Sequence, residues 1–134
     1  MKNVILLLSI VLIFVGCSDD EGDNTVELLG EWALVEIYAD PGDGSGDFVP
    51  VESELRIQFN SDDSVNSNGN LCFFSANLVE PGNYVYDYET ETNTINGLNC
   101  SVTFEPLSFE IENNRLFVSY PCIEPCVMKF SKVG

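Results

Sequence analysis

The sequence predicts an all-β fold, an antiparallel up-and-down β-barrel of about eight strands. Beyond residue 26, apolar residues recur at every second position in almost every segment, which is the period of a strand with one buried face. Clusters of Gly, Pro, Asn and Asp separate these segments, and none has the period of an amphipathic helix. A run of short hairpins without long crossovers favours a closed barrel, because closure removes the unpaired edges of the sheet.

The predicted strands are short and follow one another along the chain. Residues 32–38 are largely apolar, and in residues 54–59 every second side chain from Leu55 to Phe59 is apolar. Residues 60–64 are Asn, Ser and Asp and predict a turn. In chain order, the predicted strands span residues 32–38, 54–59, 71–75 (a third or fourth strand, near Val65), 84–88, 94–98, 104–112, 116–120 and 127–132.

The last part of the chain predicts a tight hairpin. In residues 104–112 every second residue from Leu107 is apolar, and Pro106 marks the start of this strand as an edge or a bulge. Asn113-Asn114 is expected to form a two-residue turn, because Asn tolerates a positive φ. The returning strand, residues 116–120, then directs its alternate apolar side chains toward the core.

The first residues have the pattern of a secretory signal. Residues 1–3 are a short basic start, residues 4–15 are apolar apart from Ser9, and the small residue Gly16 precedes Cys17. The apolar run is shorter than the about 20 residues that a membrane-spanning helix needs. A Cys in this place resembles the signal of bacterial lipoproteins, in which the thiol is acylated and cleavage makes Cys17 the mature N-terminus.

An acidic segment follows the expected lipidation site. Residues 17–26 contain several acidic groups and no basic one, which predicts an extended, self-repelling tether. Residues 18–21 resemble the export signal of surface-displayed lipoproteins of some Gram-negative bacteria. We therefore expect a signal peptide (1–16), a disordered tether (17–26) and a monomeric barrel domain (27–134), lipid-anchored to the outer membrane and exposed at the cell surface.

The charge of the chain limits its partners. It has 22 acidic and five basic residues and a formal net charge of −17. Nucleic acids bind to clusters of Lys and Arg, which are missing here, so we expect no nucleic-acid partner. An anionic membrane surface is repelled for the same reason, and membrane contact is expected from the lipid alone. The charge favours a basic protein as partner.

The sequence contains no histidine. This excludes Ser-His-Asp and Cys-His catalytic arrangements and zinc sites with His ligands. Acidic residues are so common that no pair stands out as a general acid and base. We therefore expect neither enzymatic activity nor a cofactor.

The four cysteines after the lipidation site predict two disulfides, because an exported protein folds in an oxidising compartment. Cys122 and Cys126 are close enough in the sequence to be joined across a tight corner between two strands, which leaves Cys72 to pair with Cys100. A zinc site is the competing interpretation, but the sequence has no Cys-x-x-Cys spacing.

The start of the predicted barrel resembles that of lipocalins. Gly30-x-Trp32 is similar to their Gly-x-Trp motif, and residues 28–132 resemble the small lipocalin-like lipoproteins of bacteria, with an acidic Gly-rich loop and a Cys-x-x-x-Cys hairpin before the last strand. The resemblance implies that Trp32 plugs the closed end of the barrel, under a basic residue of the last strand, Lys129 or Lys132. It also implies a small apolar or amphipathic ligand in the open end.

Four aromatic residues are candidates for contacts with such a ligand. Tyr84, Tyr86 and Tyr88 share one face of a predicted strand. If they point inward they line a cavity or belong to the core, and if they point outward they form an exposed interaction stripe; the core is favoured. Trp32 is the fourth candidate, although a structural plug is the favoured role for it.

The acidic, Gly-rich loop contains a weak candidate for a calcium site. Asp43, Ser45, Asp47 and Glu54 fall at positions one, three, five and twelve of a calcium-loop spacing. The sixth position, which needs Gly for the turn, is Phe48. A loop at the mouth of the barrel without a metal is therefore the favoured interpretation.

Two functions remain open. The first is a non-catalytic binding module that holds a small apolar or amphipathic ligand, which requires a connected cavity of about 300 Å³ at the open end of the barrel. The second is a protein or glycan interaction module, for example an inhibitor of a cationic enzyme, with the barrel as an inert scaffold.

The lipidation site gives a direct prediction. Replacing Cys17 by Ser removes the only thiol next to the signal, so the protein should leave the membrane fraction and become soluble or stay unprocessed. Metabolic labelling with a radioactive fatty acid, followed by fractionation, measures this. Label that persists on the Cys17→Ser protein would contradict the assignment.

Overall fold

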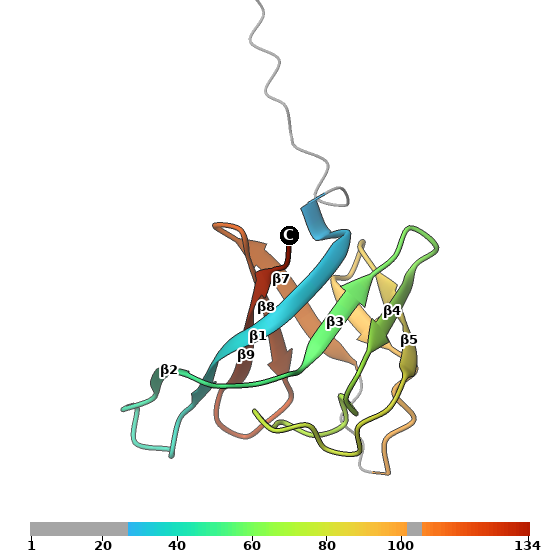
Figure 1. The fold of residues 1–134 in the computed structure, drawn as a ribbon. Helices are drawn as coiled ribbons and strands as arrows, with labels where there is room; N and C mark the ends of the chain where they lie inside the picture. Colours follow the sequence, from blue (N-terminus) through green and yellow to red (C-terminus); the bar gives the residue numbers. More distant parts are fainter. Residues whose placement is uncertain (1–26, 102–105) are drawn as a thin grey trace, which may run out of the picture.

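The computed structural model describes residues 27–101 and 106–134. Their strands form one closed antiparallel barrel (Figure 1). The predictions for the signal peptide, Cys17 and the tether fall on residues 1–26 and lie outside the described residues, as do residues 102–105. Outside the strands, Glu27 and Leu28 have helical backbone and lead into the barrel.

All strands of the described residues belong to one sheet with the order β2-β1-β3-β4-β5-β6-β7-β8-β9, and β1 also pairs with β9. This last pairing closes β1 and β3–β9 into the predicted eight-stranded up-and-down barrel. The strands are β1 (Gly30–Ala39), β2 (Asp47–Pro50), β3 (Arg56–Phe59), β4 (Ser64–Ser67), β5 (Tyr84–Glu89), β6 (Thr94–Asn96), β7 (Leu107–Glu112), β8 (Arg115–Tyr120) and β9 (Cys126–Lys132).

Strand β1 changes its partner halfway along its length. Its first residues, from Gly30 to Ala33, pair with β3, and its last residues, from Glu36 to Ala39, pair with β2. A bulge at Val35 separates the two halves, and β9 pairs with β1 on both sides of this bulge. A bulge bends a strand and increases its twist. The hairpin of β1 and β2 therefore projects from the side of the barrel, at the lower left of Figure 1.

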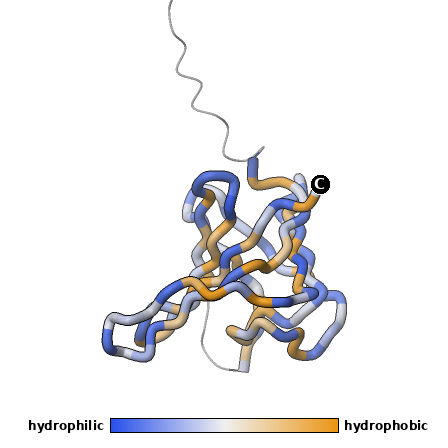
Figure 2. The backbone as a smooth tube through the Cα atoms, turned by 60° about the vertical axis from the view of Figure 1, so that its left-hand side comes forward, coloured by the Kyte–Doolittle hydropathy of each residue, from blue (hydrophilic) through white to orange (hydrophobic). Residues whose placement is uncertain are grey.

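The interior of the barrel follows the predicted alternation. Leu55, Ile57 and Phe59 are all buried, as are Tyr86 and Tyr88 of β5. Figure 2 shows the hydrophobic stretches along the strands and mostly hydrophilic residues at the turns. Each buried large apolar side chain contributes about 1.5–3 kcal/mol relative to its exposed state, so this continuous core is the main source of stability.

The turn between β7 and β8 has the predicted form. Asn113 and Asn114 have φ angles of 51° and 58°, the left-handed conformation that a two-residue turn of type I′ requires at both positions. The register continues on both sides of the turn, with Glu112 opposite Arg115 and Phe109 opposite Val118.

One predicted strand does not form, and two observed strands were not predicted. Residues 71–75 form turns and bends instead of a strand, because their backbone donors are satisfied locally: the Leu71 N–H donates to the Tyr86 hydroxyl (3.1 Å) and the Cys72 N–H to Asn70 Oδ1 (3.0 Å). The predicted strands also lacked β4 at residues 64–67, next to the predicted turn, and β2, a four-residue strand that follows the acidic loop and ends at Pro50.

Both predicted disulfides are confirmed. Cys72 is bonded to Cys100 with a Cα–Cα distance of 5.5 Å, and Cys122 to Cys126 with 5.9 Å. The first joins the β4–β5 loop to the segment after β6, and the second closes the β8–β9 hairpin. Both therefore lie at the end of the barrel opposite Trp32, which we call the loop end.

The two disulfides should differ in their effect on stability. They span sequence separations of 28 and 4 residues, which correspond to about 3.6 and about 2 kcal/mol in the chain-entropy estimate. Replacing Cys72 and Cys100 by Ser should therefore lower the free energy of unfolding about 1.5 kcal/mol more than the same change at Cys122 and Cys126. Urea unfolding of the two double variants tests this, and a larger loss for the hairpin pair would contradict it.

Candidate functional site

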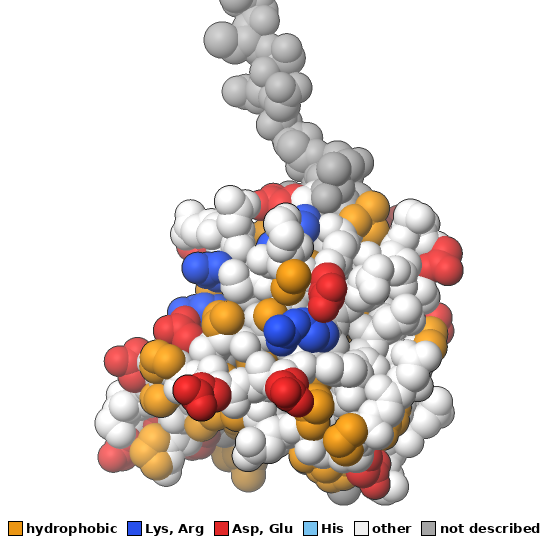
Figure 3. All heavy atoms as spheres, viewed as in Figure 1, with side chains coloured by type: hydrophobic (Ala, Val, Ile, Leu, Met, Phe, Trp, Pro, Cys, Tyr) orange, Lys and Arg blue, Asp and Glu red, His pale blue; other side chains and the backbone are white. Residues whose placement is uncertain are grey.

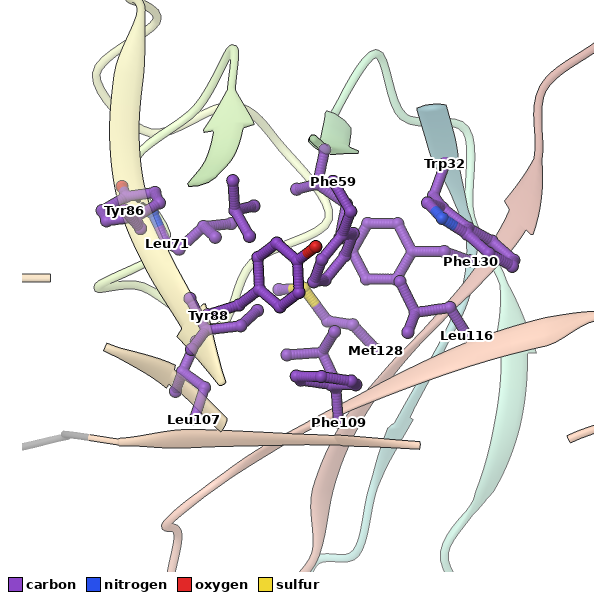
Figure 4. Packing of buried hydrophobic residues seen from close by; sticks show 14 of the residues in the cluster. Trp32, Phe59, Leu71, Tyr86, Tyr88, Leu107, Phe109, Leu116, Met128 and Phe130 are labelled. Carbon is purple, nitrogen blue, oxygen red and sulfur yellow. Dashed lines mark hydrogen bonds between the residues drawn. The ribbon is translucent and has the colours of Figure 1, made fainter. Parts of the chain in front are cut away.

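Side chains fill the middle of the barrel. Phe59, Tyr88 and Phe109 form an aromatic cluster, with ring centroids 5.1 Å apart for Phe59–Tyr88 and 5.4 Å for Phe59–Phe109. Met128 and Phe130 of β9 are fully buried and pack into the same core (Figure 4). The protein's own side chains thus occupy the interior space that a lipid or another apolar ligand would need.

Trp32 closes one end of the barrel. Its side chain is fully buried, and its Nε1 donates a hydrogen bond to the Leu28 carbonyl (2.8 Å). Lys132 lies over the indole, with Nζ 5.1 Å from the ring centroid and 2.5 Å from the Glu27 carbonyl oxygen. The expectation of a basic residue from the last strand over the tryptophan is confirmed, and the residue is Lys132.

The glycine of the Gly-x-Trp motif has a backbone and a packing role. Gly30 has a φ of +119°, a conformation that residues with a side chain rarely adopt, and a Cβ there would lie 3.3 Å from Lys132 Cε. The same glycine therefore permits both the entry of the chain into β1 and the approach of the lysine to Trp32. We call the end of the barrel that Trp32 closes the Trp32 end.

The three tyrosines of β5 belong to the core, which is the alternative that the sequence favoured over an exposed stripe. Tyr86 and Tyr88 are buried and Tyr84 is half-buried. Each hydroxyl has a protein partner: Tyr84 donates to the Glu80 carbonyl (2.6 Å), Tyr88 to the Asn60 carbonyl (2.8 Å), and Tyr86 accepts the Leu71 N–H. Burial raises the pKa of Tyr86 and of Tyr88. As candidate ligand contacts, the two buried tyrosines and Trp32 are closed off from solvent in this state.

The β4–β5 loop, residues 68–83, covers the loop end. Leu71 of this loop is buried, and Phe74 packs against Tyr120 with the ring centroids 5.4 Å apart. A depression of about 260 Å³ lies at this end, lined by residues 52–54 and 76–78. One of about 220 Å³ at the Trp32 end reaches Phe109. Neither reaches the roughly 300 Å³ expected of a ligand site.

One polar atom in the core has no partner. The Tyr120 hydroxyl is the buried side-chain oxygen or nitrogen without a hydrogen bond among the described residues. It lies under the β4–β5 loop, where burial, and secondarily Tyr86, raise the pKa of this phenol. A buried hydroxyl without a hydrogen bond is costly, typically by about 1–3 kcal/mol.

The acidic loop between β1 and β2 is organised by Asp40, which was not among the weak calcium candidates. The Asp40 carboxylate accepts the N–H groups of Gly42 (2.8 Å), Gly44 (3.1 Å) and Gly46 (3.3 Å). The Gly42 hydrogen bond, ahead of the others, lowers the pKa of Asp40. The Asp40 side chain thus fixes the shape of this loop.

The candidate calcium ligands are engaged locally. Asp43 accepts both the N–H and the hydroxyl of Ser45, and the Ser45 hydroxyl is the leading cause that lowers the pKa of Asp43. Asp47 accepts the N–H of Phe48 (2.7 Å). Within residues 27–101 and 106–134, no three His, Cys, Asp or Glu side chains come together in a way that could hold a metal ion.

The outer face of the barrel carries a groove that the sequence analysis did not find. It has a volume of about 340 Å³ and lies between the β1–β2 hairpin and strands β7–β9. Tyr38, Phe48 and Phe117 supply its aromatic surface, and Glu110 and Glu112 lie on the side of β7. The signal that could have indicated it is Phe117, an aromatic residue at an outward position of β8, between the inward-facing Leu116 and Val118.

Searches for similar proteins identify no relative: no family model, no curated protein and no solved structure matches this chain. In the part of the chain that the structure describes, no helix has the length and apolar character to cross a membrane.

The unpartnered hydroxyl gives a testable prediction. Tyr120→Phe should leave the free energy of unfolding unchanged or raise it by about 1 kcal/mol, because it removes a buried donor that bonds to nothing. Tyr88→Phe is the matched control and should lower stability by about 1 kcal/mol, since it breaks the bond to Asn60. Chemical denaturation measures both, and a Tyr120→Phe loss as large as the control would show that this hydroxyl has a partner in solution.

Proposed function

We propose that the protein is a lipid-anchored, non-catalytic module at the cell surface that binds a basic protein partner through the outside of its barrel. The observation that carries this proposal is the filled interior. Trp32 closes one end, the β4–β5 loop covers the other, and the aromatic cluster of Phe59, Tyr88 and Phe109 occupies the middle. The barrel therefore serves as a rigid scaffold, and recognition falls to its outer surface.

The charge supports a basic partner. The chain has a formal net charge of −17, and the ion pairs among its described residues number two, Arg56–Glu31 and Lys129–Glu36. Most of the described carboxylates therefore stay without an internal counter-charge. A surface of this kind attracts a cationic protein over distances near a Debye length, about 8 Å at physiological ionic strength, and raises the association rate.

The position of the proposed anchor supports recognition away from the membrane. The described chain begins at Glu27, beside Lys132 and Trp32, so a tether that precedes it joins the barrel at the Trp32 end. The loop end, with both disulfides and the projecting β1–β2 hairpin, lies on the opposite side of the barrel (Figure 1). A partner that approaches from outside the cell meets these loops first.

Binding of a small amphipathic ligand inside the barrel is the second candidate function. The Tyr120 hydroxyl favours it, because a polar group of a ligand at this place would satisfy that buried donor. The β4–β5 loop would have to move to admit such a ligand, since Leu71 and Phe74 pack over the core. The exterior is the better supported site.

A binding experiment with defined proteins tests the proposed function. The full chain in nonionic detergent is titrated with lysozyme, ribonuclease and cytochrome c as basic probes, and with acidic proteins of similar size as controls. We expect at least one basic protein to bind with micromolar affinity and to bind more weakly as the salt concentration increases. The acidic controls should not bind. Isothermal titration calorimetry over a series of salt concentrations measures this.

Two outcomes would contradict the proposal. One is that no basic protein binds better than the acidic controls. The other is that all basic proteins bind equally and lose binding at physiological ionic strength, which would reduce the effect to net charge without a specific surface.

A further inference from the structure

The groove on the outer face is built by a strand that curls away from the barrel. Tyr38 and Phe48 are paired across the β1–β2 hairpin, with ring centroids 5.3 Å apart. Phe48 also lies 5.8 Å from Phe117 of β8, although β1 and β9 separate β2 from β8 in the sheet. The Phe48 side chain thus reaches across the outer face toward β8, and the groove of about 340 Å³ lies beside it.

The wall of the groove already stabilises a cation. Lys129 Nζ lies 3.9 Å from the centroid of Phe48 and 5.7 Å from that of Phe117, and the same ammonium group forms an ion pair with Glu36. An ammonium over an aromatic face is attracted by the ring quadrupole. Lys129 thus occupies one face of Phe48 and pairs with Glu36, so an external cation needs carboxylates elsewhere in the groove.

The opposite wall offers unpaired carboxylates. Glu110 and Glu112 are exposed on β7, and neither takes part in an ion pair among the described residues. Arg115 lies opposite Glu112 in the sheet, but its guanidinium donates to the Ser131 hydroxyl (2.5 Å). Figure 3 shows acidic and hydrophobic side chains side by side over the β1–β2 hairpin, at the lower left.

The geometry points to a binding site for a cationic polypeptide segment, which rests on the proposed function and locates it. An Arg or Lys of the segment lies against Glu110 and Glu112, and a neighbouring large apolar side chain fills the space beside Phe48 and Phe117. The volume suits one or two side chains and is at the lower limit for a whole small molecule. A second copy of this acidic chain is repelled by its charge.

The test uses short synthetic peptides as probes and the full chain in nonionic detergent. A peptide of alternating arginine and leucine is titrated into ¹⁵N-labelled protein, with a peptide of alternating glutamate and leucine as control. We expect the amide shifts to cluster around Tyr38, Phe48, Phe117 and Val127, and the acidic peptide to cause none. Phe117→Ser should weaken binding at least about ten-fold, because a central aromatic anchor is lost.

Matched variants separate the groove from general effects. Val85 is an exposed apolar residue on β5, four strands from β9 in either direction around the barrel, so Val85→Ser should change binding less than about two-fold. Glu110→Gln with Glu112→Gln alters only exposed side chains and should weaken binding about five-fold or more at low salt. Glu89→Gln with Glu91→Gln removes the same charge at the β5–β6 turn and should leave the affinity within about two-fold.

The outcomes distinguish this inference from the proposed function. If lysozyme or another basic protein binds but the shifts map elsewhere, or if the groove variants match their controls, the groove is not the site and the proposed function stands. If the basic peptide causes no shifts while an oligosaccharide does so in the groove, the inference is overturned in favour of a glycan. If no basic protein binds at all, the proposed function itself fails.

Discussion

The pairing of β1 with β9 is the constraint on which the rest of the structure depends. It joins the first strand of the chain to the last and turns an open meander into a closed barrel. This pairing brings Lys132 beside Trp32 at one end and Lys129 beside Glu36 further along. Because contacts between strands far apart in the sequence carry a loop-closure cost, the core between them has to supply the stability.

The closed barrel is short and its inward residues are large. Phe59, Tyr88 and Phe109 meet in its centre, and Trp32 closes one end. A barrel of eight strands is just wide enough to be filled by side chains or to hold one small ligand. In this chain the side chains fill it, and the β4–β5 loop covers the end that a ligand would enter. The proposed function therefore uses the outside, where the charge and the projecting hairpin lie.

The bulge at Val35 links the fold to the candidate site. The Leu34 N–H donates to the Leu55 carbonyl, and the Val51 N–H donates to the Val35 carbonyl, so the chain that connects β2 to β3 runs along β1 at this point. Beyond it, β1 pairs with β2 in place of β3. The hairpin that results carries Phe48 over β8 and β9 and creates the groove around Lys129. An irregularity in one strand thus supplies a concave site on the outer surface.

Much of the barrel could be predicted from local patterns. The period of two along residues 54–59 and 84–88, the Asn113-Asn114 turn and the spacing of Cys122 and Cys126 each depend on neighbouring residues. The same alternation could have selected Lys132 over Lys129 as the lysine near Trp32. Lys132 is two residues after the inward-facing Phe130, whereas Lys129 is at an outward position. The confirmed Cys72–Cys100 bond then followed by elimination.

Other features were decided by tertiary contacts. Residues 71–75 are apolar enough for a strand, yet Leu71 is buried at the end of the barrel. Its backbone N–H donates a hydrogen bond to the Tyr86 hydroxyl, fifteen positions away in the chain. The bend of β1 decides which side of the barrel β2 lies on. It therefore also decides where the groove between Phe48 and Phe117 forms. The sequence by itself determined which side chains turn inward, because alternation is a property of each strand. Only the tertiary structure decided whether those side chains leave a cavity and where the hairpin folds, because both depend on how distant strands pack against each other.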